Sequence, residues 1–266
     1  MKKDIVFFDM DGTLTPPRKK FNWSLEPALR DLTQWCEVGI VTGSDYNYLM
    51  EQMGKFLENS PAGYHIHLLP CNGTKWYKPP PYHDQTHKKV YSVSMEHFLG
   101  AKPFQELMKV IIKMQSEISG LNRLTLKGNF IDFRGSTINW CPIGRSSNEQ
   151  DRLRFIEYDK KEAFRLRYID RIKIHLKKFG LSQKVAIKTG GQTSFDIFPV
   201  GWDKTFALRH FPDWSYWFVG DRCEGNGNDK EIYEACGGQA FKTTGPEATR
   251  DIIYEIMKEL YEKNSD

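Results

Sequence analysis

Two carboxylates near the start of the chain have a spacing that suits phosphoryl transfer. The segment DMDGT, residues 9–13, directly follows an apolar run that ends at Phe8. Ligands of open parallel sheets bind beyond the carboxyl ends of the strands, so both acids are expected at such an end. Asp9 can attack phosphorus and hold the phosphoryl group covalently. Asp11 can protonate the leaving oxygen and then deprotonate the next acceptor. The alternative, a pair of turn-capping aspartates, is disfavoured by the flanking FFD and GTLT.

This segment resembles the haloacid dehalogenase (HAD) superfamily of phosphotransferases, and the resemblance implies further groups in a set order. A hydroxyl after a second strand should bind the transferring phosphoryl group, and IVTGSD supplies Thr42 and Ser44. A lysine should neutralise the phosphate and the attacking carboxylate, and Lys204 in GWDK opens a helix. Each element is weak by itself, because Ser and Thr commonly follow strands and a lone Lys is usually solvated.

The resemblance also implies a carboxylate at the end of a later strand, which should complete a magnesium site. Asp221 in FVGD has this place, and Asn228 and Asp229 lie beyond it. Magnesium prefers hard oxygen ligands and keeps several waters, so Asp9, Asp221 and the backbone carbonyl of Asp11 would suffice. The four elements in the implied order together form a strong signal for Mg2+-dependent phosphotransfer.

The segments around these residues alternate between strands and helices. An apolar strand precedes Asp9, a helix capped by Ser24 follows, and GIVTG, HIHLLP, WSYWFVGD and GQAFKTT have the character of further strands. A final helix opens at Pro246. This alternation predicts βαβ units and a parallel sheet.

The pattern changes after the turn-rich stretch PPPYHDQTHKK, which begins at Pro79. Two long amphipathic helices are expected there, and the second begins at a capping box of Asp159 and Glu162 and ends at Gly180. Between and after them, NFIDFRG, INWCPIGR and QTSFDIFP alternate as hairpin strands do. We therefore predict an α/β fold with two parts. They are a HAD-like Rossmannoid core with a parallel sheet, residues 1–92 and 199–266, and an inserted α+β cap, residues 93–198.

Composition limits the class of protein. Of the 266 residues, 39% are hydrophobic and 14% aromatic, which allows a sizeable core. The 38 basic and 34 acidic residues give a net charge of +4 and are spread along the chain, which favours a solvated surface over nucleic-acid binding. No apolar run approaches the roughly 18 residues of a membrane helix. The opening MKKDIVFF lacks a cleavage site, and five cysteines without a CxxC pair fit reduced thiols in the cytoplasm.

Longer blocks narrow the resemblance. GNFIDFRGSTINWCPIGRSS, with Arg152 after it, and GGQTSFDIFPVGWDK are similar to the eukaryotic-type phosphomannomutases, and the similarity runs from FFDMDGTLTPPR to the final helix. It implies interconversion of mannose 6-phosphate and mannose 1-phosphate through an aspartyl phosphate and a hexose 1,6-bisphosphate, a reaction that feeds GDP-mannose synthesis. It further implies Mg2+, hexose 1,6-bisphosphate as activator, a homodimer through the cap and a cytoplasmic location. Turnover of glucose phosphates stays open.

The resemblance assigns roles to matching residues. Asp9 would be the nucleophile and Asp11 the general acid and base. The other assignments are substrate-binding Arg18, Arg134, Arg145, Arg152, Ser194 and Asp196, phosphate-binding Ser44 and Lys204, and metal-binding Asp9, Asp11 and Asp221. A mutase must hold a bisphosphate by its far phosphate while the near one reacts, and arginine forks bind phosphate bidentately. Three arginines within 19 positions of the insert fit that need, although each taken alone also fits a surface salt bridge.

The chain departs from the family in four places. PCNG, residues 70–73, replaces PENG and loses an acid, and RCEGNGND after Asp221 replaces a loop like KTMPGGND. The segment YEAC, residues 233–236, lacks the carboxylate of a further cation site, so the existence of a second metal stays open. A PPP insertion lies at the domain boundary near Pro80.

Two other functions stay open beside the mutase. The same fold could serve a sugar-phosphate phosphatase, in which water takes the phosphoryl group, or a non-catalytic sugar-phosphate-binding protein. The intact set of Asp9, Asp11, Lys204 and Asp221 argues against the binding protein. The arginines of the insert favour the mutase over the phosphatase, because they offer a second phosphate site.

Overall fold

The N-terminal strand shows how local sequence creates the main sheet. In the computed structural model, which describes residues 2–82, 86–118 and 124–265, the last four residues of β1 (Asp4–Phe8) are fully buried. A strand that is apolar on both faces belongs in the interior of a parallel sheet. β1 accordingly pairs in parallel with β2 (Glu37–Val41) on one side and β10 (Ser215–Gly220) on the other.

The main sheet has seven strands in the order β11-β10-β1-β2-β3-β4-β5. β3 (Ile66–Leu69) and β11 (Ala240–Lys242) extend its parallel part. β4 (Lys75–Lys78) and β5 (Lys88–Ser92) are added in antiparallel fashion at one edge. β1, β2 and β10 run in the same direction, so their carboxyl ends lie together at the same end of the strands.

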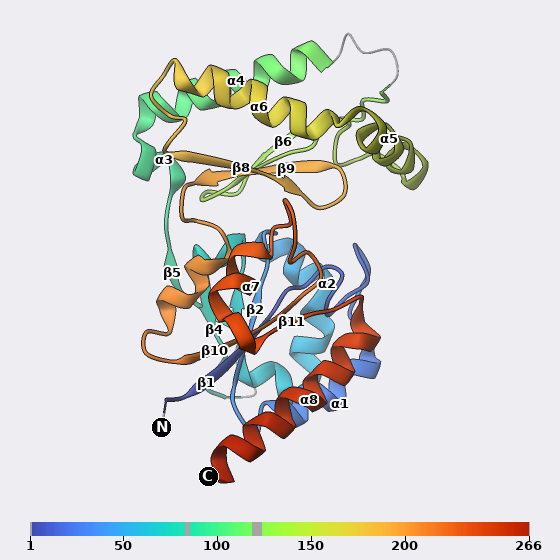
Figure 1. Cartoon of the computed structure of the whole chain (residues 1–266), viewed down its shortest axis with the longest axis vertical. Coiled ribbons are helices and arrows are strands. Elements are labelled where there is room, and N and C mark those ends of the chain that lie inside the picture. Colours follow the sequence, from blue (N-terminus) through green and yellow to red (C-terminus); the bar gives the residue numbers. More distant parts are fainter. Residues whose placement is uncertain (1, 83–85, 119–123, 266) are drawn as a thin grey trace. The chain divides into compact units, whose positions relative to one another are not determined.

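Helices cover both faces of this sheet (Figure 1). One face packs against α1 (Glu26–Leu32), α2 (Tyr46–Asn59) and α8 (Pro246–Ser265). The other face packs against α7 (Lys230–Cys236) and the 3-10 helix η4 (Lys204–His210). Four shorter 3-10 helices are η1 (Trp23–Leu25), η2 (Pro61–His65), η3 (Cys71–Gly73) and η5 (Gly237–Gln239).

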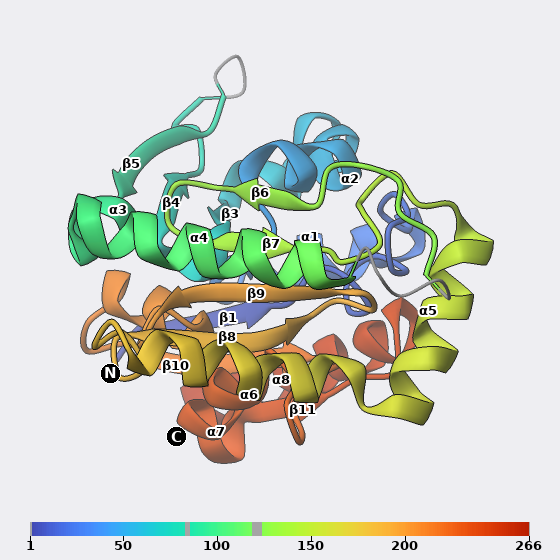
Figure 2. The same cartoon turned by 90° about the horizontal axis from the view of Figure 1, so that it is seen from above.

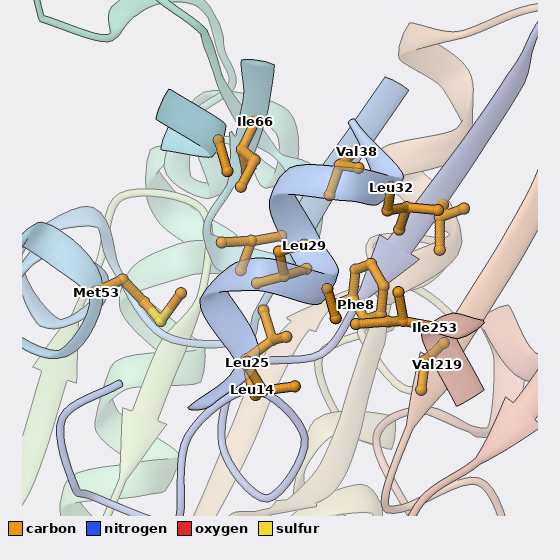
Figure 3. Packing of buried hydrophobic residues seen from close by; sticks show 14 of the residues in the cluster. Phe8, Leu14, Leu25, Leu29, Leu32, Val38, Met53, Ile66, Val219 and Ile253 are labelled. Atoms are coloured by element: carbon orange, nitrogen blue, oxygen red, sulfur yellow. The ribbon is translucent and has the colours of Figure 1, made fainter. Parts of the chain in front are cut away.

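Alternate residues of β1 enter two different cores. Val6 and Phe8 lie with Leu29 of α1 in the core under α1, α2 and α8, part of which Figure 3 shows. Ile5 and Phe7 lie in the core under α7 and η4. Full burial of one such side chain contributes roughly 1.5–3 kcal/mol. The strand that leads to Asp9 is thus anchored from both faces.

The contacts divide the chain into two compact units, Met1–Ser92 with Trp202–Asp266, and Val93–Gly201. The second unit holds an antiparallel sheet of order β6-β7-β9-β8, and α4 and α6 run next to each other along one of its faces (Figures 1 and 2). Its strands are β6 (Ile131–Phe133), β7 (Ile138–Trp140), β8 (Val185–Gly190) and β9 (Ser194–Pro199). Its helices are α3 (Met95–Leu99), α4 (Ala101–Ile118), α5 (Glu149–Glu162) and α6 (Phe164–Lys177).

The predicted α/β class, a parallel-rich sheet with a separate α+β part, is confirmed. The predicted cap of α1 is wrong, because Asn22 rather than Ser24 caps the preceding η1 turn, its side chain accepting from the Ser24 N–H. The second boundary between the units falls after Gly201, three residues beyond the expected 198. Part of the stretch expected at the first boundary, residues 83–85, lies outside the described residues.

The predicted capping box in the second unit is also wrong. Asp159 and Glu162 belong to α5, a helix that the sequence pattern did not reveal, and α6 begins only after Ala163, whose φ is +48°. α5 escaped prediction because Phe155 is its one buried apolar residue. Within the described part of the chain, the helices lack the combined length and apolar character that a membrane crossing requires.

Candidate active site

The carboxyl ends of β1 and β10 and the start of α7 bring three acids together. Asp9 follows β1 and Asp221 follows β10, and these two strands are parallel neighbours. Carboxylate oxygens of Asp9, Asp221 and Asp229 all lie within 4.8 Å of one another. Asp9 and Asp229 are buried and Asp221 is half-buried. The acidic cluster formed by these three residues has the dimensions of a site for one cation.

Lys204 supplies a positive charge to this cluster. The side chain is fully buried, and its Nζ donates to Asp9 Oδ1 and to Asp229 Oδ1, the latter at 2.5 Å. Lys204 is the first residue of η4, whose start is capped by Asp203. Burial lowers the pKa of Lys204, but the carboxylates of Asp229 and Asp9 outweigh burial and raise that pKa above its usual value. The ammonium group therefore stays charged.

One ammonium group does not balance three carboxylates. Burial, together with the charges of Asp229 and Asp221, raises the pKa of Asp9 well above its usual value, although Lys204 opposes the shift. Burial and Asp229 raise the pKa of Asp221 to about 6, again against Lys204. A further positive charge in the cluster would favour the ionised form of both acids.

Two buried oxygens, one on Asp221 in the cluster and one on Asn228, the residue before Asp229, could bind such a positive charge. Asp221 Oδ1 and Asn228 Oδ1 are buried and accept no hydrogen bond from the residues that the structure describes. Both are hard oxygen donors of the kind that Mg2+ binds. Asp229 differs, because its Oδ2 accepts from the Arg222 N–H at 3.0 Å and its Oδ1 is held by Lys204. Asp9 and Asp221 thus fit a divalent cation.

Gly12 makes room for Asp221. A Cβ at position 12 would lie 2.4 Å from Asp221 Oδ2, which is closer than real Cβ contacts allow, and the φ of +91° also favours glycine. The glycine of the DMDGT segment is therefore required twice, by the backbone turn and by the acid that it faces.

The carboxylate of Asp11 is not a member of the acidic cluster. Its Oδ1 accepts from the Arg18 backbone N–H at 3.0 Å, from Gln52 Nε2 at 3.3 Å and from the Tyr48 hydroxyl at 3.4 Å. The metal role expected of Asp11 concerned its backbone carbonyl, so the two roles involve different atoms. The predicted metal role therefore does not involve the side chain, whose carboxylate accepts these three hydrogen bonds.

The loop after β2 presents the predicted hydroxyls. Thr42 is buried, and its Oγ1 accepts from the Ser44 N–H at 3.1 Å. The PCNG turn supports this loop through backbone contacts, because Asn72 N donates to the Thr42 carbonyl and Cys71 N to the Ser44 carbonyl, both at 2.8 Å. Cys71, Asn72 and Gly73 all have positive φ. These contacts need no side-chain carboxylate at position 71, so the loss of the PENG acid leaves them intact.

Buried threonines hold the loop after β1 in place. The Thr249 hydroxyl of α8 donates to the Thr13 carbonyl at 3.0 Å and lies 2.9 Å from Thr243 Oγ1. The Thr243 N–H donates to the Gly220 carbonyl at the end of β10, at 2.9 Å. This network joins the loop that follows Asp9 to β10, the strand that precedes Asp221. Sequence reasoning missed it, since threonines in a loop and a helix carry no distinguishing pattern.

In the second unit, polar side chains share one face of the small sheet. The strand register places four of them next to one another, Asp132, Asn139, Asp196 and Lys188. The flanking positions form the opposite, apolar face, where Trp140 contacts Tyr168 of α6. Because side chains alternate along a strand, Ser194 lies on the same face as Asp196. Lys188 was not predicted, since a single lysine in VAIKTG gave no signal of its own.

The predicted arginines of this unit join the same region. Arg134 Nε contacts Asp132 Oδ2 at 3.0 Å, and Arg145 Nη1 donates to Asn139 Oδ1 at 3.0 Å. Asn139 in turn donates to Asp196 Oδ1 at 2.8 Å. Arg134 and Arg145 thus both contact polar side chains on this face of the small sheet.

Arg152 reaches the loop that leads into β9. It is nine-tenths buried, and its Nη1 and Nη2 donate to Thr193 Oγ1 at 3.3 Å and Gln192 Oε1 at 3.2 Å. The second unit thus gathers five of the six predicted substrate residues. The sixth, Arg18, lies in the first unit, where it is exposed and has a φ of +60°.

Comparison with known proteins decides the family. A model of the eukaryotic phosphomannomutase family matches residues 25–259, which is most of the chain. The chain belongs to that family. It is 32% identical over 262 residues to a probable phosphomannomutase of Caenorhabditis elegans, covering 97% of both chains. It is 33% identical over 257 residues to phosphomannomutase 1 of Dictyostelium discoideum, covering 95% of this chain and 96% of that one. The family predicted from the sequence is confirmed.

Solved structures share the fold of this phosphomannomutase family member. An IMP-bound variant of the IMP-nucleotidase of Plasmodium falciparum superposes with a TM-score of 0.69 at 17% identity, over 96% of this chain and 68% of that one. A trehalose-6-phosphate phosphatase of Aspergillus fumigatus superposes with a TM-score of 0.52 at 17% identity, over 98% of this chain and 93% of that one. Likeness at this identity concerns the fold alone, and it confirms the expected HAD-like architecture.

Proposed function

We propose that this chain is a phosphomannomutase that interconverts mannose 6-phosphate and mannose 1-phosphate. The observation that carries the proposal is the contact of Asp9 with buried Lys204, beside Asp221 and Asp229, in a member of this family. A carboxylate held by an ammonium group at the end of a parallel strand has the setting of a phosphoryl acceptor.

The covalent step uses Asp9 and Asp11. A carboxylate oxygen of Asp9 attacks phosphorus, the bond between phosphorus and the sugar oxygen breaks, and Asp11 gives that oxygen its proton. This half of the cycle releases a monophosphate from the hexose 1,6-bisphosphate. In the other half, phosphorylated Asp9 gives its phosphoryl group to the free hydroxyl of the isomeric monophosphate and Asp11 takes the proton of that hydroxyl, which forms the bisphosphate. Thr42 and Ser44, whose loop follows the neighbouring strand β2, hold the phosphoryl oxygens together with Lys204.

A divalent cation, Mg2+ in this proposal, would be held by Asp9, Asp221 and the backbone carbonyl of Asp11. When bound, it supplies positive charge that offsets the carboxylates and the transferring phosphoryl group. The unpartnered oxygens of Asp221 and Asn228 and the raised pKa of Asp221 support this site.

The second unit is proposed to hold the phosphate that does not react. Arg134, Arg145 and Arg152 offer planar donor forks, and Ser194 and Asp196 suit a phosphate and a sugar hydroxyl. Arg18 is proposed to add a further contact. A bisphosphate held in this way stays bound while its two ends exchange roles, which a phosphatase does not require.

Three further features belong to the same proposal. A hexose 1,6-bisphosphate acts as activator, because a free Asp9 needs a phosphoryl donor before a monophosphate can be converted. Two copies associate through the second unit, on which Ile112 and Ile174 are exposed by 55% and 63%. The enzyme works in the cytoplasm, and glucose phosphates are a second substrate pair to be assayed.

Product analysis tests the proposal. The chain is incubated with Mg2+, mannose 1-phosphate and a trace of mannose 1,6-bisphosphate, and phosphorus NMR follows mannose 6-phosphate and inorganic phosphate. A mutase converts most of the substrate to mannose 6-phosphate. Release of inorganic phosphate as the main product would instead identify a phosphatase, and unchanged substrate would identify a binding protein.

A further inference from the structure

Arg165 is a partly buried arginine of the second unit that has no assigned role. It is the second residue of α6, and it follows the break at Ala163 that separates α5 from α6. Its side chain is 12% exposed, so its charge is largely removed from water. A charge in such a place needs strong partners to be tolerated.

The first partner of Arg165 is Asp159 of α5. The Arg165 backbone N–H donates to Asp159 Oδ1 and the side-chain Nε donates to Asp159 Oδ2, both at 2.7 Å. The Asp159 side chain is itself only 14% exposed. Arg165 is therefore fixed to the helix that also carries Arg152.

The second set of partners is the loop between β8 and β9. Arg165 Nη1 donates to the Gly191 carbonyl at 3.1 Å and to the Ser194 carbonyl at 3.3 Å. These two carbonyls bracket Gln192 and Thr193, the residues whose side chains accept from Arg152. One arginine thus holds the backbone ends of the loop, and the other holds its side chains.

We propose that Arg165 is a positioning residue for the mutase reaction, which clamps residues 191–194 so that Ser194 and Arg152 are aligned for the non-reacting phosphate. This inference rests on the proposed function. If Arg152 turns its donors from Gln192 and Thr193 to a phosphate, the loop loses those contacts. The contacts of Arg165 persist, because its partners are Asp159 and backbone carbonyls rather than substrate.

Lysine cannot replace arginine in this clamp. One ammonium group can pair with Asp159, but it lacks the planar fork that reaches the carboxylate and the two carbonyls together. The variant Arg165→Lys therefore separates the ion pair from the clamp, whereas Arg165→Met removes both. Arg167→Met is the matched control, because Arg167 is an exposed arginine of the same helix.

The test combines hydrogen exchange with kinetics on the full chain. Without any sugar phosphate, amide exchange of residues 191–194 should be at least tenfold faster in Arg165→Met and Arg165→Lys than in Arg167→Met. With mannose 1-phosphate as substrate, both Arg165 variants should raise KM by roughly ten- to a hundredfold, the cost of a misplaced contact. Their kcat should stay within about twofold, because the lost binding is common to ground and transition states.

Two results would overturn the clamp. One is exchange in residues 191–194 equal to that of Arg167→Met, and the other is full recovery of KM by Arg165→Lys, which would leave only the ion pair. If Arg165→Met does not fold, Arg165→Lys decides by the same criteria. A wild-type chain without mutase turnover would refute the proposed function instead, and the exchange measurement would still decide whether Arg165 holds the loop.

Discussion

Removal of Lys204 should destabilise the first unit strongly. The substitution Lys204→Met keeps the length of the side chain but deletes the charge that contacts Asp9 and Asp229. Asp229 is completely buried, and Asp9 is 4% exposed, so neither can recover its solvation in water. Removing one partner of a buried ion pair typically costs about 3–5 kcal/mol. For a unit of this size that corresponds to a decrease in Tm of about 6–20 °C.

The loss of stability in Lys204→Met should become smaller as the pH falls. In the wild type the pKa of Asp9 is already raised, and loss of Lys204 removes a charge that opposes this shift. A carboxyl group whose pKa is higher in the folded chain binds protons more readily there than in the unfolded chain. The folded variant therefore gains stability as the pH falls, and the difference in Tm between wild type and variant should narrow between pH 8 and pH 5.

Differential scanning fluorimetry without added metal, at pH 8, 7, 6 and 5, measures both effects. Lys258→Met is the control, since that lysine side chain is 76% exposed. If Lys204→Met and Lys258→Met had the same Tm at pH 8, the buried ion pair would not stabilise the fold. A difference that stayed constant down to pH 5 would refute the electrostatic explanation of the loss.

Three further changes address the same site. Asp11→Asn should lower kcat by about 10²–10⁴-fold. The amount of phosphoenzyme that forms on Asp9 from a bisphosphate should stay the same, as rapid-quench assays can show. Asp221→Asn should raise at least tenfold the Mg2+ concentration that gives half-maximal thermal stabilisation. It should also reduce the gain in stability that the metal-free protein shows on acidification through pH 6, because the pKa of Asp221 in the folded chain is about 6. Thr249→Val should lower the free energy of unfolding in urea by about 1–3 kcal/mol, since the buried Thr13 carbonyl loses its donor. An unchanged value would show that the threonine network does not stabilise the fold.

The parts of the fold that follow from the sequence are those that local patterns determine. Four consecutive apolar residues of β1 predict a buried parallel strand, and the acids that follow it must then lie at the sheet edge. The alternation of strands and helices predicted the parallel part of the main sheet, but not the antiparallel strands β4 and β5. In contrast, α5 has too small an apolar face, and β8 too mixed a sequence, to be recognised by period alone.

The parts of the site that escaped prediction depend on contacts between distant segments. The sequence showed Asp229 near Asp221, but only the folded loop shows that Asp229 pairs with Lys204 in the cluster. Arg165 resembles any other arginine of a charged helix until the loop between β8 and β9 is placed against it. Side-chain direction in loops is determined by such tertiary contacts, and it leaves no periodic signal in the sequence.

Labelling of the phosphoenzyme tests whether Asp9 carries the phosphoryl group. The chain is mixed with Mg2+ and a hexose 1,6-bisphosphate labelled in both phosphates, quenched in acid within milliseconds and treated with hydroxylamine. We expect a stoichiometric, acid-stable and hydroxylamine-labile label in the wild type, located by peptide mapping at Asp9, and no label in Asp9→Asn. A label of the same amount in Asp9→Asn, or a label mapped to another residue, would contradict it.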